Sequence, residues 1–230
     1  MKFIHGGRAA SGSALRLTLD LMRFVLASQS PARLNMLRDA GIEPLVRVSG
    51  VDEEAIEKSL PDARPDTVVT ALAEAKARAV LASVIAEFPD AVIVGCDSML
   101  HFDGALMGKP ATVDIARERW GRMAGNSGHL LTGHAVLRVD NGEVTSTATG
   151  TESTVVNFGK PTDRELEAYL ASGEPLRVAG AFTLDGRGGW FVDGIEGDHS
   201  GVIGISLPLM RRLLADVNLS VVDFWSPPTS

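Results

Sequence analysis

Two long strand-like segments joined by Asn141-Gly142 constrain the fold more than any other feature of the chain. Residues 129–140 and 143–157 flank this dipeptide. Asn-Gly favours a two-residue turn because both of its positions accept positive φ, so the two segments are predicted to pair as antiparallel strands. Asp103-Gly104 predicts a second hairpin, between residues 99–102 and 105–107.

Strand-like and helix-like segments alternate through the first half of the chain. Ser30 can cap a helix that starts at Pro31 and stops at Gly41. The predicted strands are 24–27, 45–48 and a buried-type strand at 91–96, and a long amphipathic helix at 66–87 is expected to bury Val69, Leu72, Ala75, Ala79 and Val80. This alternation predicts an α/β protein.

Helix signals continue in the second half. Thr112 caps a predicted helix that runs to about Met123, and Thr162 with Glu165 forms a capping-box pattern for a helix ending at Gly173. Ser206-Leu207-Pro208 opens the last predicted helix. The intervening segment is dense in glycine from Gly180 to Gly204, which favours tight turns and close backbone approach to a ligand.

Composition excludes several classes of protein. The formal net charge of −7 argues against binding to long nucleic acid, because that affinity depends on clustered Lys and Arg. No apolar run approaches the length of a membrane span, so no membrane association is expected. The single cysteine, Cys96, cannot form an internal disulfide, which fits a cytoplasmic location.

Residues 22–225 are expected to form a single domain. Residues 1–21 contain no continuous apolar segment and are interpreted as a loose N-terminal extension, with Met22 as an alternative start. Residues 226–230 are interpreted as a frayed tail.

Two junctions carry groups suited to phosphate chemistry. At the first, Ser28, Ser30 and Arg33 surround a predicted helix start, where unpaired N–H groups attract anions; simple capping by Ser30 is an equally good explanation. At the second, an apolar strand is expected to deliver Asp97 at its carboxyl end, where a carboxylate could hold a metal or activate water. The alternative is an aspartate that merely caps a turn.

Lys76, Lys109 and Glu53 complete the candidate set. The two lysines suit a triphosphate, although most lysines are solvated surface groups, and Glu53 could be a second metal-binding carboxylate or part of an acidic loop. His129 and His134 do not form a zinc pattern and are interpreted as strand residues near the cleft. The chain contains no G-x-x-x-x-G-K-[ST] phosphate loop.

Six motifs in order resemble the Maf family, and the likeness extends from Phe24 to about Leu214. They are Leu26-Ala27-Ser28-Gln29-Ser30-Pro31-Ala32-Arg33, Val51-Asp52-Glu53, Ala75-Lys76-Ala77, Gly95-Cys96-Asp97-Ser98, Gly108-Lys109-Pro110 and Ser172-Gly173-Glu174-Pro175.

The resemblance implies a nucleoside triphosphate pyrophosphatase that releases a monophosphate and pyrophosphate. It implies an elongated, two-lobed α/β fold with a central mixed, twisted sheet flanked by helices, similar to the inosine triphosphatases. Asp97 then corresponds to the proton acceptor and, with Glu53, to a site for Mg²⁺ or Mn²⁺. By the same likeness, the phosphate contacts are Ser28, Arg33, Lys76 and Lys109. A homodimer is the expected assembly.

This chain departs from the family pattern at three positions. Ser98 stands where threonine is usual, which keeps the hydroxyl, and Val178 stands where lysine is common. Asp185 replaces glutamine or glutamate and is expected to contact substrate and to affect which base is accepted. We therefore expect a broad nucleotide preference.

Two other functions compete with hydrolysis. The first is a non-catalytic nucleotide-binding regulator of septum formation or cell division. Two carboxylates facing a polyanion argue against pure binding. The second is a nucleotidyltransferase acting on sugar phosphates, which would need a Gly-rich basic loop near the N-terminus, where only Arg33 is found.

Overall fold

The computed structural model describes residues 22–226, so the predictions for residues 1–21 and for the last four residues of the tail lie outside the described part. The elements in chain order are β1 (Arg23–Leu26), α1 (Pro31–Asp39), β2 (Leu45–Val46), α2 (Glu53–Lys58), α3 (Pro65–Ile85), β3 (Ala91–Phe102), β4 (Ala105–Met107), α4 (Val113–Met123), β5 (Ser127–Asp140), β6 (Glu143–Phe158), α5 (Asp163–Ala171), η1 (Pro175–Arg177), η2 (Ala179–Ala181), η3 (Arg187–Phe191), β7 (Val192–Glu196), α6 (His199–Ile203), α7 (Leu207–Asp216) and η4 (Val221–Phe224).

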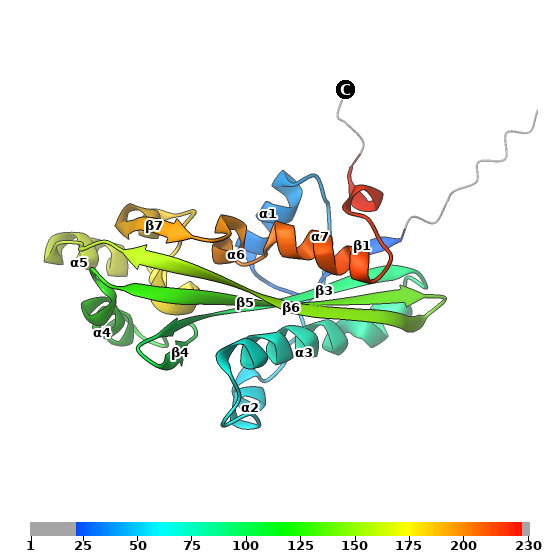
Figure 1. The fold of residues 1–230 in the computed structure, drawn as a ribbon, viewed down its shortest axis with the longest axis horizontal. Coiled ribbons are helices and arrows are strands. Elements are labelled where there is room, and N and C mark those ends of the chain that lie inside the picture. The colour runs from blue at the N-terminus through cyan, green and yellow to red at the C-terminus, as the bar shows by residue number, and fades with distance from the viewer. Residues whose placement is uncertain (1–21, 227–230) are drawn as a thin grey trace, which may run out of the picture.

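A mixed sheet forms the centre of the elongated molecule, and β3, β5 and β6 run along its length (Figure 1). Within residues 22–226 the sheet has seven strands in the order β2-β1-β3-β5-β6-β7, with β4 paired to β3. β1 is parallel to β2 and β3, whereas β3, β5, β6 and β7 pair antiparallel. The predicted α/β class with a mixed sheet flanked by helices is confirmed.

Both predicted hairpins are present. Asn141 and Gly142 adopt φ of 53° and 80° between β5 and β6, and Asp103 and Gly104 adopt φ of 50° and 76° between β3 and β4. Positive φ at both turn positions matches the right-handed twist of the flanking strands. The hairpin signal therefore correctly located β5 and β6, the two longest strands within residues 22–226.

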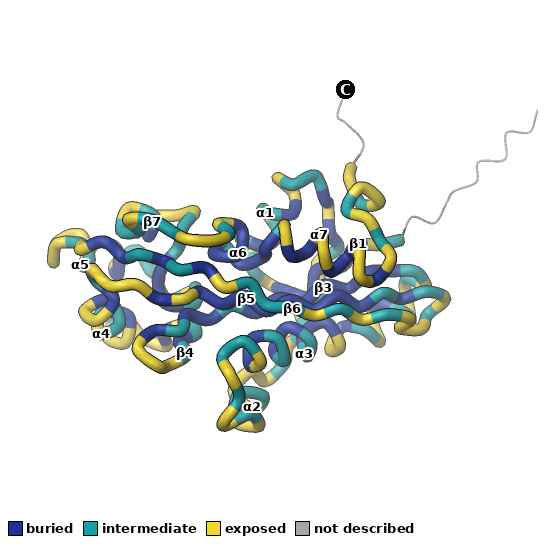
Figure 2. The backbone as a smooth tube through the Cα atoms, in the orientation of Figure 1, coloured by how far each residue is buried: buried dark blue, intermediate teal, exposed yellow. Residues whose placement is uncertain are grey.

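Helices cover both faces of the sheet at the end where β1 lies. On one face α1 and α7 cover a first buried cluster, and on the opposite face α3 covers a second one (Figures 1 and 2). Alternation along β3 explains this arrangement, because Val92 and Val94 belong to the first cluster and Ala91 and Ile93 to the second. A strand covered on both faces has no polar side, which accounts for the apolar run at 91–96.

A separate core holds the opposite end of the molecule together. Trp120 of α4 packs edge-on against Phe158, Tyr169 and Phe191, and its indole N–H donates to the carbonyl of Ala181 over 2.8 Å. This packing secures the glycine-rich segment against the sheet.

Close approach in the glycine-rich segment is to protein atoms. A Cβ at Gly188 would lie 2.5 Å from the Tyr169 hydroxyl, and one at Gly180 would lie 2.8 Å from Cβ of Leu100. Gly180 also has a φ of 68°, so the predicted tight turns are confirmed. The expected close approach to a ligand stays a prediction.

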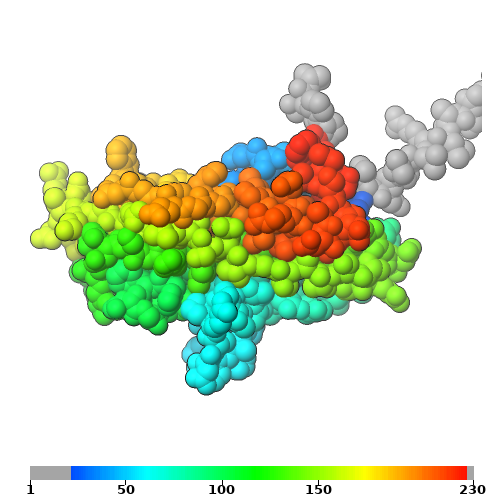
Figure 3. Space-filling model, in the orientation of Figure 1, coloured from blue at the N-terminus to red at the C-terminus, as the bar shows by residue number. Residues whose placement is uncertain are grey.

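Several boundaries differ from expectation. The second strand ends at Val46 rather than at residue 48, and in the long helix Ala79 is exposed while Ala73 and Ala77 are buried. The acidic segment at Glu53 is a short helix, α2, that projects from the body (Figure 3). None of the helices within residues 22–226 is long and apolar enough to cross a membrane.

Candidate functional site

Two glycines allow α3 to lie unusually close to the sheet. A Cβ at Gly95 of β3 would be 2.1 Å from the carbonyl oxygen of Ala73, and one at Gly133 of β5 would be 2.2 Å from that of Val69. No side chain fits in either gap. Lys76 follows Ala73 by about one helical turn, and Asp97 follows Gly95 on the same face of β3. The close packing therefore brings Lys76 against Asp97.

Lys76 joins two carboxylates from different elements. Its Nζ lies 2.5 Å from Oδ1 of Asp97 and 2.7 Å from Oε1 of Glu53, the first residue of α2. Asp97 and Lys76 are buried, at 6% and 8% exposure, while Glu53 is half exposed. Asp52 caps α2 by accepting from the amide of Ala55, which fixes the direction of the helix that carries Glu53.

The sequence predicts Asp97 at the end of its strand, but the structure places it within β3. β3 continues to Phe102 because β5 pairs with it along its whole length, from Ala91↔Val139 to His101↔His129. The parallel partner β1 stops earlier, at Leu26, which pairs with Val94. Asp97 therefore lies three residues beyond Val94, the last residue of β3 that pairs with the parallel strand β1.

The two carboxyl groups have opposite pKa shifts. Burial raises the pKa of Asp97 above its ordinary value, against the opposing charges of Lys76 and Arg33. Partial burial also acts to raise the pKa of Glu53, but the hydrogen bond and charge of Lys76, aided by Lys109 and Arg33, lower it. Paired groups with diverging pKa values are typical of acid–base sites. Burial thus makes Asp97 a better proton acceptor than an exposed aspartate, and the lowered pKa keeps Glu53 ionised at neutral pH.

Arg33 is folded into the protein at the start of α1. Ser30 caps this helix by accepting from the Arg33 amide, as predicted. The Arg33 guanidinium donates from Nε to the carbonyl of Gly204 at 2.7 Å, from Nη1 to Ser28 Oγ at 3.2 Å and from Nη2 to Ser98 Oγ at 3.1 Å. Among residues 22–226, two of its five N–H groups have no partner and are available to an anion.

Ser28 completes this part of the site. Its Oγ accepts from the amide of Ser30 and from Arg33, so its own O–H remains available within the described residues. The helix start, the serine hydroxyl and the guanidinium thus lie together, and their charges and dipoles favour an anion.

The last two candidate residues are exposed. Lys109 follows β4, and its charge contributes to the lowered pKa of Glu53. Asp185 lies between η2 and η3, and within residues 22–226 no hydrogen bond or ion pair joins its side chain to the other candidates. The structure joins Lys76 to Glu53 and Asp97 by ion pairs and Arg33 to Ser28 by a hydrogen bond. The charges of Arg33 and Lys109 also act on the carboxyl groups of this cluster, whereas Asp185 has no such link.

The carboxylates suit a divalent cation whose remaining coordination positions are filled by phosphate oxygens. Asp97 and Glu53 present carboxylate oxygens to one shared positive charge, that of Lys76. Residues 22–226 contain no group of three or more His, Cys, Asp or Glu side chains that would form an all-protein cage. Mg²⁺ is commonly held by one or two carboxylates together with substrate phosphates, so the residues fit this ion.

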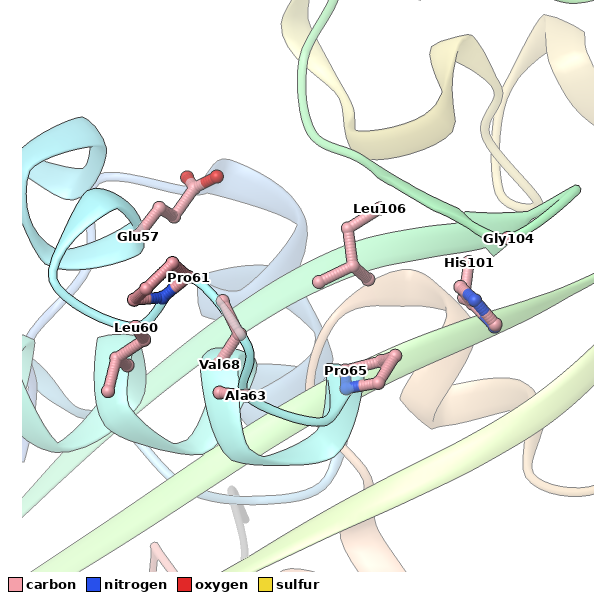
Figure 4. A pocket seen from close by; sticks show the side chains of 9 residues that line it. All are labelled: Glu57, Leu60, Pro61, Ala63, Pro65, Val68, His101, Gly104 and Leu106. Carbon is pink, nitrogen blue, oxygen red and sulfur yellow. The ribbon is translucent and has the colours of Figure 1, made fainter.

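A hollow of about 400 Å³ opens beside the cluster, between the α2–α3 segment and the β3–β4 hairpin (Figure 4). Its lining combines polar and apolar groups and includes Glu57, His101 and Leu106. Partial burial and the negative charges of Asp97 and Glu53 raise the pKa of Glu57. Glu57 therefore links the hollow electrostatically to the charged cluster.

Sequence reasoning missed residues that complete the site. Glu57 would have been found if α2 had been predicted, because it lies one turn after Glu53. Thr132 hydrogen-bonds Ser98 and is its direct partner across β3 and β5. No local signal reveals such a pairing, since it depends on the register of strands distant in sequence.

His134 is fully buried rather than near a cleft. Its Nε2 accepts from the amide of Ser206, so the ring hydrogen is on Nδ1 and donates to the carbonyl of Thr132. Burial and the nearby Arg33 lower the pKa of His134 to about 4. This residue therefore joins β5 to the start of α7 as a neutral imidazole.

The fold and the cluster define an α/β protein in which a buried lysine joins two carboxylates and an arginine lies at a helix start. A family model described as Maf-like protein matches residues 23–217, and the chain belongs to this family. The family resemblance of the sequence motifs is thereby confirmed.

Curated relatives cover nearly the whole chain. A nucleoside triphosphate pyrophosphatase of Saccharopolyspora erythraea is 61% identical over 210 residues, which are 91% of this chain and 100% of the relative. Proteins of the same name from Rhodococcus opacus and Nocardia farcinica are 64% and 60% identical, over 88% and 89% of this chain and 96% and 97% of their own lengths.

Proposed function

We propose that this chain is a nucleoside triphosphate pyrophosphatase, a hydrolase that converts a nucleoside triphosphate and water to a nucleoside monophosphate and pyrophosphate. The observation that carries the proposal is the buried Lys76 ammonium held between Asp97 and Glu53. The shared name of relatives at 55–64% identity supports it.

Asp97 is the proposed general base. Its carboxylate takes a proton from the attacking water, whose oxygen bonds to the α-phosphorus as the bond to the α–β bridging oxygen breaks. Burial raises its pKa, which makes it a stronger proton acceptor than an exposed aspartate. Lys76 limits the cost of this buried charge and keeps the carboxylate in place.

Ser28, Arg33, Lys76 and Lys109 are the proposed phosphate contacts. The two unused N–H groups of Arg33 and the hydroxyl of Ser28 can donate to non-bridging oxygens, and the start of α1 adds a favourable dipole. Holding the pyrophosphate leaving group in line with the attacking water lowers the barrier through positioning and charge stabilisation.

A divalent metal, Mg²⁺ or Mn²⁺, is the proposed cofactor. Glu53 and Asp97 would hold it, and the lowered pKa of Glu53 keeps that ligand ionised at neutral pH. When bound, such an ion offsets negative charge that develops on the phosphate oxygens.

The proposal extends to the substrate range, the assembly and the cellular location of the protein. Asp185 is exposed beside the glycine-rich turns, and we propose that it contributes to base selection, with a broad preference as the outcome. A homodimer in the cytoplasm is the proposed state, and the one cysteine, which is buried and reduced, is compatible with that compartment.

A non-catalytic nucleotide-binding regulator of septum formation or cell division is the alternative. The buried Asp97 argues against it. A binder of polyanions would gain nothing from a desolvated carboxylate beside its phosphate contacts.

A panel of standard and modified nucleoside triphosphates, assayed with Mg²⁺ or Mn²⁺, tests the proposal. Nucleoside monophosphate and pyrophosphate are expected in equal amounts without any second substrate, and excess chelator should abolish turnover. Binding without product would favour the regulator, and dependence on a sugar phosphate would favour a transferase.

A further inference from the structure

A chain of hydroxyl groups connects Arg33 to the backbone of α6. Nη2 of Arg33 lies 3.1 Å from Ser98 Oγ, Ser98 Oγ lies 2.9 Å from Thr132 Oγ1, and Thr132 Oγ1 lies 2.8 Å from the carbonyl oxygen of Gly201. Thr132 is fully buried in β5, directly opposite Ser98 in β3. The chain therefore crosses the centre of the sheet.

The direction of every bond in this chain follows from its two ends. A carbonyl oxygen only accepts, so Thr132 spends its single hydroxyl hydrogen on Gly201. Thr132 can then only accept from Ser98, which in turn has no hydrogen left for another partner. Ser98 therefore presents a lone pair to Arg33, and a guanidinium, which has donors only, is the group that fits.

The backbone after α6 is shaped around the same guanidinium. The carbonyl of Gly204 accepts from Arg33 Nε, and a Cβ at Gly204 would lie 3.2 Å from that nitrogen. Gly204 has a φ of 129°, which disfavours any other residue. Ser98 and Gly204 thus hold two different edges of the Arg33 group, and Ser28 holds a third nitrogen.

We propose that Thr132 is a positioning residue for anion binding, acting through Ser98 to orient the two free N–H groups of Arg33. Thr132 needs no contact with the substrate. Its hydroxyl fixes the polarity of Ser98, which would otherwise be able to turn its hydrogen toward Arg33 and repel it. The inference rests on the proposed function in one respect only, that Arg33 contacts the phosphates.

Thr132→Val tests the inference, because it keeps the shape of the side chain and removes the hydroxyl. Binding of inorganic tripolyphosphate is measured by calorimetry, and kcat/KM for a nucleoside triphosphate is measured alongside. We expect Thr132→Val to weaken both by about tenfold, the scale of a lost hydrogen bond to a charged group. Thr132→Ser, which restores the hydroxyl, should return both to within about twofold of the wild type.

Thr154→Val is the matched control. Thr154 is equally buried and its hydroxyl bonds the backbone of Asp198 at the start of α6, but it is not part of the chain to Arg33. This variant should bind tripolyphosphate within about twofold of the wild type. An effect equal to that of Thr132→Val would mean that general attachment of α6, and not the hydroxyl chain, determines binding, and would overturn the inference.

A double-mutant cycle separates positioning from a structural effect. In an Arg33→Met background, Thr132→Val should cause no more than about a twofold further loss, because its effect is transmitted through Arg33. A full tenfold loss in that background would contradict the inference. If the wild type binds tripolyphosphate but hydrolyses no nucleotide, the proposed function fails while the cycle still decides the inference. If it neither binds nor hydrolyses, both are wrong.

Discussion

Among the individual residues, one buried lysine determines the electrostatics of the site. Lys76 is almost fully buried and makes ion pairs with Asp97 and Glu53. Without it, Asp97 would be a buried carboxylate with a second negative charge nearby. Breaking a buried pair by removing one partner is costly because the other charge is left uncompensated.

Lys76→Met tests this view of the cluster. We expect the free energy of unfolding at pH 7 to fall by about 3 kcal/mol, from loss of the compensating charge. Urea denaturation measures the change. Lys58→Met is the control, because Lys58 pairs with Glu54 on the exposed surface of α2 and its loss should cost less than about 0.5 kcal/mol. Equal stability of the Lys76 variant and the wild type would contradict the view that Lys76 compensates the buried charge of Asp97.

Residue identities at the site were accessible from the motifs, but their contacts were not. Asp97, Glu53 and Lys76 were candidates by residue type and position, the family resemblance suggested their roles, and the structure brings them together. The pairing of Ser98 with Thr132 and the proximity of Glu57 required the strand register and the helix α2. Short motifs give the residue types that a site needs, whereas register gives their partners.

Among the helices and strands, two glycines determine how closely α3 packs against the sheet. Gly95 and Gly133 let the backbone of α3 approach β3 and β5 so closely that Lys76 reaches Asp97. The sequence predicted these three elements, but not the distance between them. It also did not predict α6 or β7, because the helix and strand signals in the glycine-rich segment are only five residues long.

Gly95→Ala is expected to destabilise the protein by about 3 kcal/mol, because the new methyl group would overlap the carbonyl of Ala73 and push α3 outward. Activity should fall with it as Lys76 moves from Asp97. The control is Gly121→Ala in α4, where no atom lies within 4 Å of the new Cβ. That change should stabilise the helix by up to about 1 kcal/mol. Thermal unfolding of both variants separates the overlap of the new methyl group with α3 from the general effect of replacing glycine by alanine. Unchanged stability of Gly95→Ala would refute the close-packing argument.

In the molecule as a whole, one sheet connects the buried clusters at its two ends. The long β5–β6 hairpin passes from the cluster beneath α7 to the cluster around Trp120 (Figure 1). The Asn141-Gly142 signal predicted this hairpin and the alternation of helices and strands predicted the α/β class, whereas the elongated shape was implied by the family resemblance. The curvature of the sheet and the burial of His134 depend on long-range packing and were not predictable.

His134 makes the stability of the whole protein depend on pH. Its pKa is about 4 in the folded state against an ordinary value of 6.5, so the unfolded state binds more protons between these values. The contribution of the neutral imidazole is complete above about pH 6.5 and is lost as the pH falls toward 4.

His134→Gln should remove this pH dependence. We expect the wild type to lose about 2 kcal/mol more than the variant when urea denaturation is repeated at pH 4.5 instead of pH 7. The difference between the two proteins cancels the contribution of the other acidic groups. Parallel pH profiles for the two proteins would show that His134 is not held in its neutral form.

Turnover by Asp97→Asn tests the central claim most directly. The amide keeps the size of the side chain but cannot accept the proton from water, so kcat should fall at least roughly 100-fold while tripolyphosphate still binds through Arg33, Lys76 and Lys109. Wild-type turnover by a folded Asp97→Asn variant would show that the buried carboxylate is not the base, and the proposed chemistry of this site would be wrong.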